Sequence, residues 1–211
     1  MSKIFVLAID GPAASGKGTI GRMLAEKYGL DYLDTGSLYR AVALQMLRAQ
    51  VPLDSESSAE AIAKSLDLDL TSDPEIRSSR LAEAAATIAA LPKVRAQLKV
   101  IQRQFAQRHP GAVLDGRDIG TVVCPDADIK LYVTASPEIR AKRRFLELQA
   151  AGSPLSEAEV LADVMARDKR DTERATSPLK PAEDAHLLDT SNLSIETAFG
   201  SAVDIIETHR G

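Results

Sequence analysis

The hydrophobic residues of this chain fall into short runs, separated by longer segments whose apolar residues recur with helical spacing. The first run, residues 3–9, is rich in β-branched side chains and ends at Asp10-Gly11, which is typical of a buried parallel strand. Further short runs lie at residues 32–33, 112–115, 129–133 and 186–188. Because strands and helices alternate, the pattern predicts an α/β fold with a five-stranded parallel sheet and helices on both faces.

Capping signals mark most of the helix starts. They are Ser57 with Glu60, Asp73-Pro74, Ser136-Pro137, Ser156 with Glu159, and Ser194. The predicted helices cover residues 18–28, 37–50, 57–66, 74–90, 93–108, 137–149, 156–174 and 195–209. Residues 66–70 alternate with a period of two and predict one short extra strand. We interpret residues 51–91 and 150–178 as inserts on the alternating core.

Composition places the chain among ordinary globular proteins. It has 211 residues, of which 45% are hydrophobic and 27% charged, which is enough for one domain with a full core. The net charge of −4 and the absence of tryptophan argue against a nucleic-acid binder. Its longest apolar run is far too short for a bilayer and lacks the features of a signal peptide, and the single cysteine excludes an internal disulfide. We expect a soluble cytoplasmic protein with no membrane partner.

A phosphate-binding loop follows the first strand. Residues 11–19 carry the Gly-x-x-x-x-Gly-Lys spacing between a strand and a helix. Glycines let backbone N–H groups approach phosphate oxygens, the helix N-terminus adds a favourable dipole, and Lys17 supplies charge for the β- and γ-phosphates. The predicted nucleotide-binding residues are Gly11, Pro12, Ala13, Ala14, Ser15, Gly16, Lys17, Gly18 and Thr19.

The residue after Lys17 departs from the commonest form of this loop. That form has a serine or threonine whose hydroxyl binds Mg²⁺, whereas this chain has Gly18, with Thr19 one position later. We therefore weigh two modes of Mg²⁺ binding equally: direct ligation by a hydroxyl, and binding through water molecules near an acidic residue. Asp115, at the end of an apolar strand, is the candidate for orienting those waters.

The loop alone fits a kinase, an ATPase or a GTPase switch. A switch needs a base reader such as Asn-Lys-x-Asp, but the only asparagine, Asn192, precedes Leu193, and no Asp-x-x-Gly occurs. The sequence therefore argues against a regulatory GTPase.

Three further motifs point to an acceptor site. They are Asp34-Thr-Gly-Ser-Leu-Tyr-Arg40, Asp115-Gly-Arg-Asp-Ile-Gly-Thr121 and Arg167-Asp-Lys-Arg-Asp-Thr-Glu-Arg174. The first two follow predicted strands, at the edge where open α/β sheets bind ligands. In the third, spacings of three and four residues place Arg167, either Arg170 or Asp171, and Arg174 on one face of the predicted helix.

With the phosphate loop, these motifs resemble the bacterial cytidylate kinases, in order and over nearly the whole chain. The resemblance implies a P-loop nucleoside-monophosphate kinase fold, in which residues 51–91 form a shortened monophosphate-binding insert and residues 150–178 form a lid. It implies transfer of phosphate from ATP, with Mg²⁺, to CMP or dCMP. By the same resemblance we expect a monomer.

The resemblance also implies roles for individual residues. Arg40, Arg117 and Arg174 match the arginines that bind the acceptor phosphate, and Lys17, Arg117 and Arg174 are the expected catalytic residues. Thr35, Arg95 and Asp118 match positions facing cytosine, and Arg167 and Asp171 match positions facing the sugar. A carboxylate at Asp118 would accept from the cytosine amino group and repel the uracil O4.

The acceptor oxygen of a nucleoside monophosphate is largely ionised at neutral pH, so this reaction needs no general base. Two alternatives stay open from the residues alone. One is a kinase for another small acceptor, for which Asp34, Asp115 or Asp118 would serve as base. The other is a nucleotide-binding module without activity.

Overall fold

The computed structural model describes residues 4–210, and the chain divides into two compact units. The first unit contains Met1–Tyr32 and Arg108–Gly211, and the second contains Leu33–Gln107. Each unit has its own hydrophobic core, and we describe each by itself.

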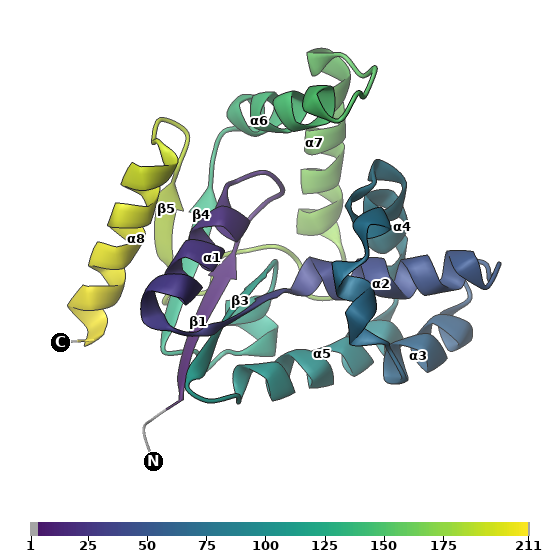
Figure 1. The fold of residues 1–211 in the computed structure, drawn as a ribbon, viewed down its shortest axis with the longest axis horizontal. Coiled ribbons are helices and arrows are strands. Elements are labelled where there is room, and N and C mark those ends of the chain that lie inside the picture. Colours follow the sequence, from purple (N-terminus) through teal and green to yellow (C-terminus); the bar gives the residue numbers. More distant parts are fainter. Residues whose placement is uncertain (1–3, 211) are drawn as a thin grey trace. The chain divides into compact units, whose positions relative to one another are not determined.

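A five-stranded sheet organises the first unit (Figure 1), with the order β2-β3-β1-β4-β5. The strands are β1 (Phe5–Asp10), β2 (Asp31–Asp34), β3 (Gly111–Gly116), β4 (Ile129–Thr134) and β5 (His186–Asp189). The pairs β1–β3, β1–β4 and β4–β5 are parallel, and Asp10 lies opposite Gly116 on β3 and Tyr132 on β4. The predicted five-stranded parallel sheet is confirmed.

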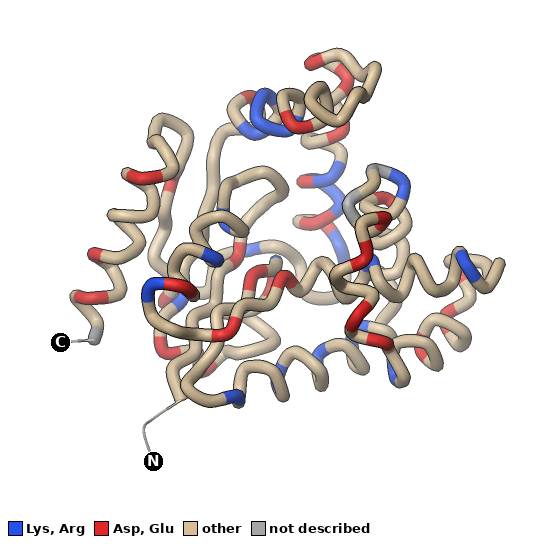
Figure 2. The backbone as a smooth tube through the Cα atoms, in the orientation of Figure 1, with Lys and Arg blue, Asp and Glu red and all other residues tan. Residues whose placement is uncertain are grey.

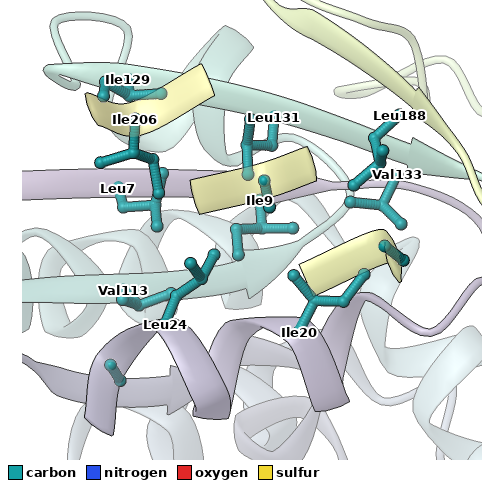
Figure 3. Close-up of a cluster of buried hydrophobic side chains, with 13 residues drawn as sticks. Leu7, Ile9, Ile20, Leu24, Val113, Ile129, Leu131, Val133, Leu188 and Ile206 are labelled. Carbon is teal, nitrogen blue, oxygen red and sulfur yellow. The ribbon is translucent and has the colours of Figure 1, made fainter. Parts of the chain in front are cut away.

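One face of this sheet is covered by α1 (Lys17–Tyr28) and α8 (Ile195–Arg210). Figure 3 shows the core between them, where Leu7 and Ile9 of β1 meet Ile20 and Leu24 of α1. On the opposite face, a turn of π-helix over Ile119–Val123 packs against β1 and β3. The strands are therefore held from both sides, which fixes the positions of their carboxyl ends.

Two further helices of the first unit, α6 (Pro137–Ala150) and α7 (Glu157–Glu173), pack against each other. The predicted capping box at the start of α7 is confirmed, because the Ser156 hydroxyl accepts from the Glu159 N–H while the Glu159 carboxylate accepts from the Ser156 N–H. Val160 and Val164 of α7 are buried against Ala141 of α6.

The second unit is helical over most of its length. Its helices are α2 (Thr35–Arg48), α3 (Glu56–Lys64), α4 (Ser79–Ala89) and α5 (Pro92–Ala106), with 3₁₀ turns at Leu68–Ser72 and Pro74–Arg77. Leu38 and Leu44 of α2 are fully buried in its core, together with Ile88 of α4 and Leu98 of α5.

The predicted strand at residues 66–70 is wrong, since this segment enters the 3₁₀ turn Leu68–Ser72. The Asp67 carboxylate accepts from the Asp69 N–H, and the Thr71 hydroxyl donates to the Leu68 carbonyl. Such local side-chain bonds satisfy the backbone without a partner strand, and they override a five-residue alternation.

Two helix starts also differ from the prediction. The helix predicted from Ser57 begins at Glu56 with Ser55 as its N-cap, because a turn closed by the Ser55 N–H and the Pro52 carbonyl starts it earlier. The helix predicted over residues 74–90 is interrupted at Ser78, whose hydroxyl accepts from the Leu81 N–H and starts α4.

Over residues 4–210, every helix is too short or too polar to cross a lipid bilayer.

Candidate active site

The loop between β1 and α1 lies close against β4. A Cβ on Gly11, whose φ is 153°, would lie 2.0 Å from the carbonyl oxygen of Val133, so glycine is required there. Gly16 is the N-cap of α1, and no side chain caps the first N–H groups of this helix. Uncapped N–H groups at the positive end of a helix dipole favour an anion, as the phosphate-loop prediction requires.

Lys17 and Ser15 are the buried polar side chains of this loop. Lys17 is 8% exposed, and its Nζ donates to the Pro12 carbonyl at 3.1 Å and lies 3.8 Å from Oδ1 of Asp115. The Ser15 hydroxyl is buried and has no hydrogen-bond partner among the described residues. A bound phosphate oxygen would satisfy such a hydroxyl, so these two side chains fit a phosphate ligand.

The structure explains Gly18. A Cβ at this position would lie 3.0 Å from Oδ2 of Asp115 and 3.4 Å from the Tyr32 hydroxyl, which itself donates to that carboxylate oxygen at 2.9 Å. Asp115 and Tyr32 therefore occupy the space next to Gly18 where the commoner loop has a hydroxyl side chain, whereas Thr19 is exposed.

This oxygen-rich corner fits Mg²⁺, which prefers hard oxygen ligands and keeps several waters. Asp115 is 5% exposed, so its carboxylate is buried beside the loop. Within residues 4–210 no group of three or more acidic, histidine or cysteine side chains forms a closed metal site. A carboxylate such as that of Asp115, beside a phosphate-binding loop, suits an ion held mainly by water and phosphate oxygens.

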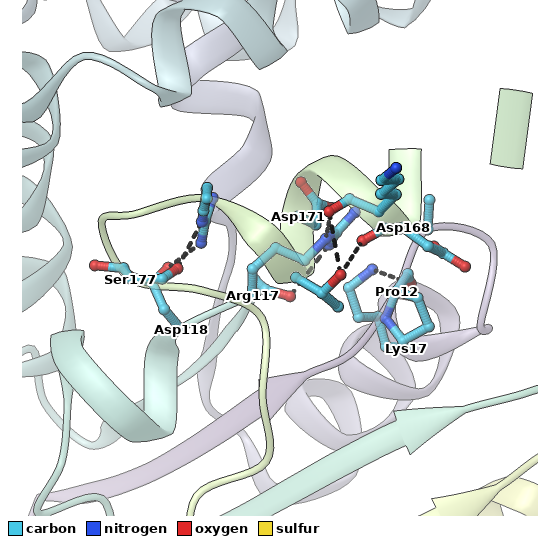
Figure 4. A network of polar contacts seen from close by, with 12 residues as sticks. Pro12, Lys17, Arg117, Asp118, Asp168, Asp171 and Ser177 are labelled. Carbon is cyan, nitrogen blue, oxygen red and sulfur yellow. Dashed lines mark hydrogen bonds and ion pairs between the residues drawn. The ribbon is translucent and has the colours of Figure 1, made fainter. Parts of the chain in front are cut away.

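Two ion pairs connect the end of β3 to the end of α7 (Figure 4). Arg117 Nε donates to Oδ2 of Asp171 at 2.8 Å, and the Arg174 guanidinium lies 3.6 Å from Oδ1 of Asp118. Burial acts to raise the pKa of Asp171, but the charge and hydrogen bond of Arg117 outweigh it and hold that pKa below its ordinary value. Four of the predicted acceptor residues are thus brought together within the first unit.

Arg174 lies just beyond α7, not on it. The helix ends at Glu173, and Arg174 is its C-cap with an extended backbone, φ −62° and ψ 138°. Its Nε donates to the Ser177 carbonyl, which turns the side chain toward Asp118. The prediction that Arg174 shares a helix face with Arg167 is therefore wrong, although basic and acidic residues do interleave along α7 as Figure 2 shows.

The second unit holds three of the other predicted acceptor residues, Thr35, Arg40 and Arg95, whereas Arg167 lies on α7 in the first unit. Asp34 is the N-cap of α2: its Oδ1 accepts from the Gly36 N–H at 2.9 Å, and its Oδ2 accepts from Arg40 at 2.6 Å. Thr35 is buried beside it. Arg95 is also buried, with its guanidinium 5.7 Å from the centre of the Tyr39 ring. Arg40 and Arg95 are therefore held in place by their own unit.

Several polar residues around the loop were not among the predicted site residues. Asp10, Tyr32 and the buried Arg140 each bond to groups distant in the sequence. The Thr190 hydroxyl donates to the Ser15 carbonyl at 3.0 Å and accepts from Arg143. Only Asp10 had a sequence signal, as a charged residue at the end of an apolar strand directly before the loop.

Comparison with known proteins gives one consistent result. The cytidylate kinase family model matches residues 7–208. Named cytidylate kinases of Rhodopseudomonas palustris (strain BisB18) and Bradyrhizobium sp. (strain ORS 278) are both 55% identical to this chain over 205 residues, which is 97% of this chain and 97% of each relative. That of Rhizobium meliloti (strain 1021) is 55% identical over 203 residues, 96% of each chain.

Solved structures of lower identity share the fold. A shikimate kinase from Bacteroides thetaiotaomicron superposes with a TM-score of 0.53 at 11% identity, covering 97% of this chain and 99% of its own. TT1252 from Thermus thermophilus gives a TM-score of 0.52 at 20% identity over 98% of both chains. These likenesses concern the fold, whereas the family match and the identity extend along the whole sequence. The chain belongs to the cytidylate kinase family.

Proposed function

We propose that this protein transfers the γ-phosphoryl group of ATP to CMP and dCMP, giving ADP with CDP or dCDP. The observation that carries the proposal is the family match over residues 7–208, in a chain whose phosphate-loop lysine lies 3.8 Å from the carboxylate that opens the acceptor motif. The phosphate loop and two of the three acceptor motifs, residues 115–121 and 167–174, thus belong to one compact unit.

The donor triphosphate binds the loop of residues 11–19. Backbone N–H groups at the start of α1 bind its oxygens, the Ser15 hydroxyl adds a hydrogen bond, and Lys17 neutralises charge on the β- and γ-phosphates. The support is that Lys17 and Ser15 are buried in the loop and that no side chain caps α1. Lys17 stabilises charge that develops during transfer, and this makes it catalytic.

Mg²⁺ is part of the proposal. Bound to the phosphates, it would neutralise charge shared between the donor and the transferred group. Asp115 would hold it through water, with Tyr32 fixing the orientation of the carboxylate by the hydrogen bond to Oδ2. Gly18 leaves room for that carboxylate beside the loop.

The acceptor phosphate binds Arg40, Arg117 and Arg174, which screen its repulsion from the donor phosphates. The acceptor oxygen is already ionised at neutral pH, so no side chain needs to remove a proton from it. The arginines of the first unit are pre-oriented by carboxylates, Arg117 by Asp171 and Arg174 by Asp118. Rate enhancement then comes from alignment and electrostatic stabilisation.

Base and sugar recognition follow from the family resemblance. Asp118 accepts a hydrogen bond from the cytosine amino group, and Arg95 donates to the ring acceptors beside Thr35. Arg167 and Asp171 contact the sugar. Uracil would present a carbonyl oxygen to Asp118, so this carboxylate discriminates against UMP.

We assign residues 51–91 as the monophosphate-binding insert and residues 150–178 as the lid. The lid contains α7, and closure over the nucleotides would exclude water and suppress hydrolysis of ATP. The monomer is the proposed functional state.

The test is a panel of initial rates with ATP and Mg²⁺ for CMP, dCMP, UMP, AMP and small hydroxyl acceptors. We expect kcat/KM to be highest for CMP or dCMP. A better rate with a hydroxyl acceptor would identify a different kinase, and ATP binding without transfer to any acceptor would identify a binding module.

A further inference from the structure

Asp10 is a buried carboxylate at the point where β1 becomes the phosphate loop. Asp10 is 4% exposed. Its two carboxylate oxygens accept hydrogen bonds from backbone amides rather than from a cation. Burial raises its pKa to about 6, although the amides of Gly120 and Ile119 act in the opposite direction. The two hydrogen bonds therefore offset only part of the free energy that is needed to bury the ionised carboxylate.

The two oxygens of Asp10 have separate partners. Oδ1 accepts from the Ile119 N–H and Oδ2 accepts from the Gly120 N–H, each at 2.8 Å. These residues begin the π-helical turn Ile119–Val123, whose first N–H groups have no partner within the turn. Asp10 thus ties the start of this turn to the end of β1.

The tie is tight because the backbone at Gly120 lies close to the sheet. A Cβ on Gly120 would lie 3.1 Å from Cδ of Lys130 on β4 and 3.4 Å from Oδ2 of Asp10. The segment that follows β3 is therefore held between β1 and β4. Its position is determined by the same residue that precedes Gly11 of the phosphate loop.

The residues immediately before this anchored backbone are Arg117 and Asp118, which pair with Asp171 and Arg174. We infer that Asp10 is a positioning residue of the transfer reaction: it anchors the backbone at Ile119 and Gly120, and so fixes Arg117 and Asp118 relative to the phosphate loop. The inference rests on the proposed function for what Arg117 and Asp118 bind. Asp10 itself acts through the backbone and touches no substrate.

A carboxylate is needed because both of its oxygens accept. In Asp10→Asn the side chain has the same shape, but the amide offers one acceptor and one donor, so one backbone N–H would face an NH₂ group. That N–H would lose its hydrogen bond while remaining buried, which is unfavourable. The substitution therefore releases one of the two anchoring bonds with little change in volume.

Asp128→Asn is the matched control. The Asp128 Oδ2 accepts from the Val6 N–H at 2.8 Å, near the opposite end of β1. This aspartate also supports β1 through a backbone amide, but the amide oxygen of an asparagine can still accept that hydrogen bond. Both variants lose one negative charge, and only Asp10→Asn affects the backbone after Asp118.

The experiment combines amide hydrogen exchange without nucleotides with steady-state kinetics for CMP and UMP. For Asp10→Asn we expect exchange at Ile119 and Gly120 to be at least about 10-fold faster, and kcat/KM for CMP to fall about 10–100-fold, mainly through KM. Asp128→Asn should match the wild-type protein at both amides and in both constants. If the two variants behave alike, or if the amides loosen while the kinetics with CMP stay unchanged, the positioning role is wrong.

A measurement on the wild-type protein covers the case in which Asp10→Asn does not fold. Scalar couplings through hydrogen bonds should connect the amide nitrogens of Ile119 and Gly120 to the carboxyl carbon of Asp10, and their absence would contradict the anchor. Exchange and couplings need no turnover, so they test the anchor even if CMP is not the acceptor. Failure of the proposed function would instead show as inactive wild-type protein with both couplings intact.

Discussion

The guanidinium of Arg140, near the start of α6, donates to both carboxylate oxygens of Asp168 on α7. The same side chain donates from Nε to the Ala135 carbonyl at 2.8 Å and from its terminal nitrogen to the Ala13 carbonyl of the phosphate loop at 3.3 Å. Arg140 is 3% exposed. One buried arginine therefore connects the phosphate loop to the helix that ends beside Arg174.

This connection should be measurable as a coupling free energy. In a double-mutant cycle of Arg140→Gln and Asp168→Asn, we expect a coupling of about 1–3 kcal/mol in the free energy of unfolding, because the pair is two-pronged and largely buried. Denaturant unfolding of the four proteins measures it. The exposed pair Arg144–Glu147 on α6 is the control, and its coupling should be too small to resolve. Equal coupling in the two pairs would show that Arg140 is an ordinary surface contact.

Removing Arg174 should impair the transition state more than the binding of CMP. Its guanidinium is mostly buried near Asp118. We propose that it binds the acceptor phosphate from the lid, so it would complete the site only when the lid closes for transfer. For Arg174→Ala we expect kcat to fall about 100-fold or more, with a rise in the KM for CMP of no more than about fivefold.

Arg170→Ala is the control for Arg174→Ala. Arg170 is exposed on α7 and carries the same charge, but the family resemblance gives it no contact. Similar losses in the two variants would indicate general electrostatics. A large rise in KM with kcat preserved would keep the contact of Arg174 but contradict its role in the transition state.

The choice between CMP and UMP should depend on Asp118. Asp118→Asn replaces a side chain that only accepts with one that can donate to the uracil O4, so the ratio of kcat/KM for CMP to that for UMP should fall at least about 10-fold. Because Asp118 also pairs with Arg174, both absolute rates should drop, and the ratio isolates base recognition. A ratio equal to that of the wild-type protein would assign cytosine recognition elsewhere.

The titration of Asp10 should be visible in protein stability. Its pKa is raised from 3.8 to about 6, mainly by burial, with Asp118 and Asp115 adding to the shift. Tyr132 lies opposite Asp10 on β4. The Lys130 side chain packs against Gly120, next to the Asp10 carboxylate, and its Nζ donates to Asp184. The folded state therefore binds this proton more tightly than the unfolded chain does, so the stabilisation is present below about pH 3.8 and is lost as pH rises through 6.

Denaturant unfolding from pH 4 to 7.5 would measure this effect as the difference between the wild-type protein and Asp10→Asn. We expect the wild-type protein to lose up to about 3 kcal/mol relative to the variant as pH rises across that range, with most of the change below pH 6.5. A difference that is constant with pH would mean that the pKa of Asp10 is unshifted.

The sequence predicted those parts of the fold that local patterns determine. The strand before Gly11, the stop of α1 and the capping box of Ser156 with Glu159 each depend on neighbouring residues, and each is confirmed. The prediction of a strand at residues 66–70 was wrong, also for a local reason. The hydrogen bond from the Asp69 N–H to the Asp67 side chain stabilises a turn, and a five-residue alternation is too short to override it.

Sequence patterns likewise predicted only those parts of the candidate site that lie within local motifs. Lys17 and the acceptor motifs could be found because their residues are close in sequence. The hydrogen bond between Tyr32 and Asp115 joins residues 83 positions apart, and that between Asp10 and Gly120 joins residues 110 positions apart. A local sequence pattern cannot predict contacts of this range. Arg174 was placed on a helix because its spacing fits one, but the bond of its Nε to Ser177 lies beyond the helix end.

The most direct measurement follows the fate of the γ-phosphate of labelled ATP in the presence of CMP and Mg²⁺, with Lys17→Ala as the matched variant. For the wild-type protein we predict that the label moves to the β-position of CDP and that little free phosphate forms. For Lys17→Ala, with the wild-type fold by circular dichroism, transfer should fall about 100-fold or more, since the loop loses the charge that stabilises the transferred group. Label released as inorganic phosphate, or near-normal transfer by folded Lys17→Ala, would contradict a CMP kinase that works through this loop.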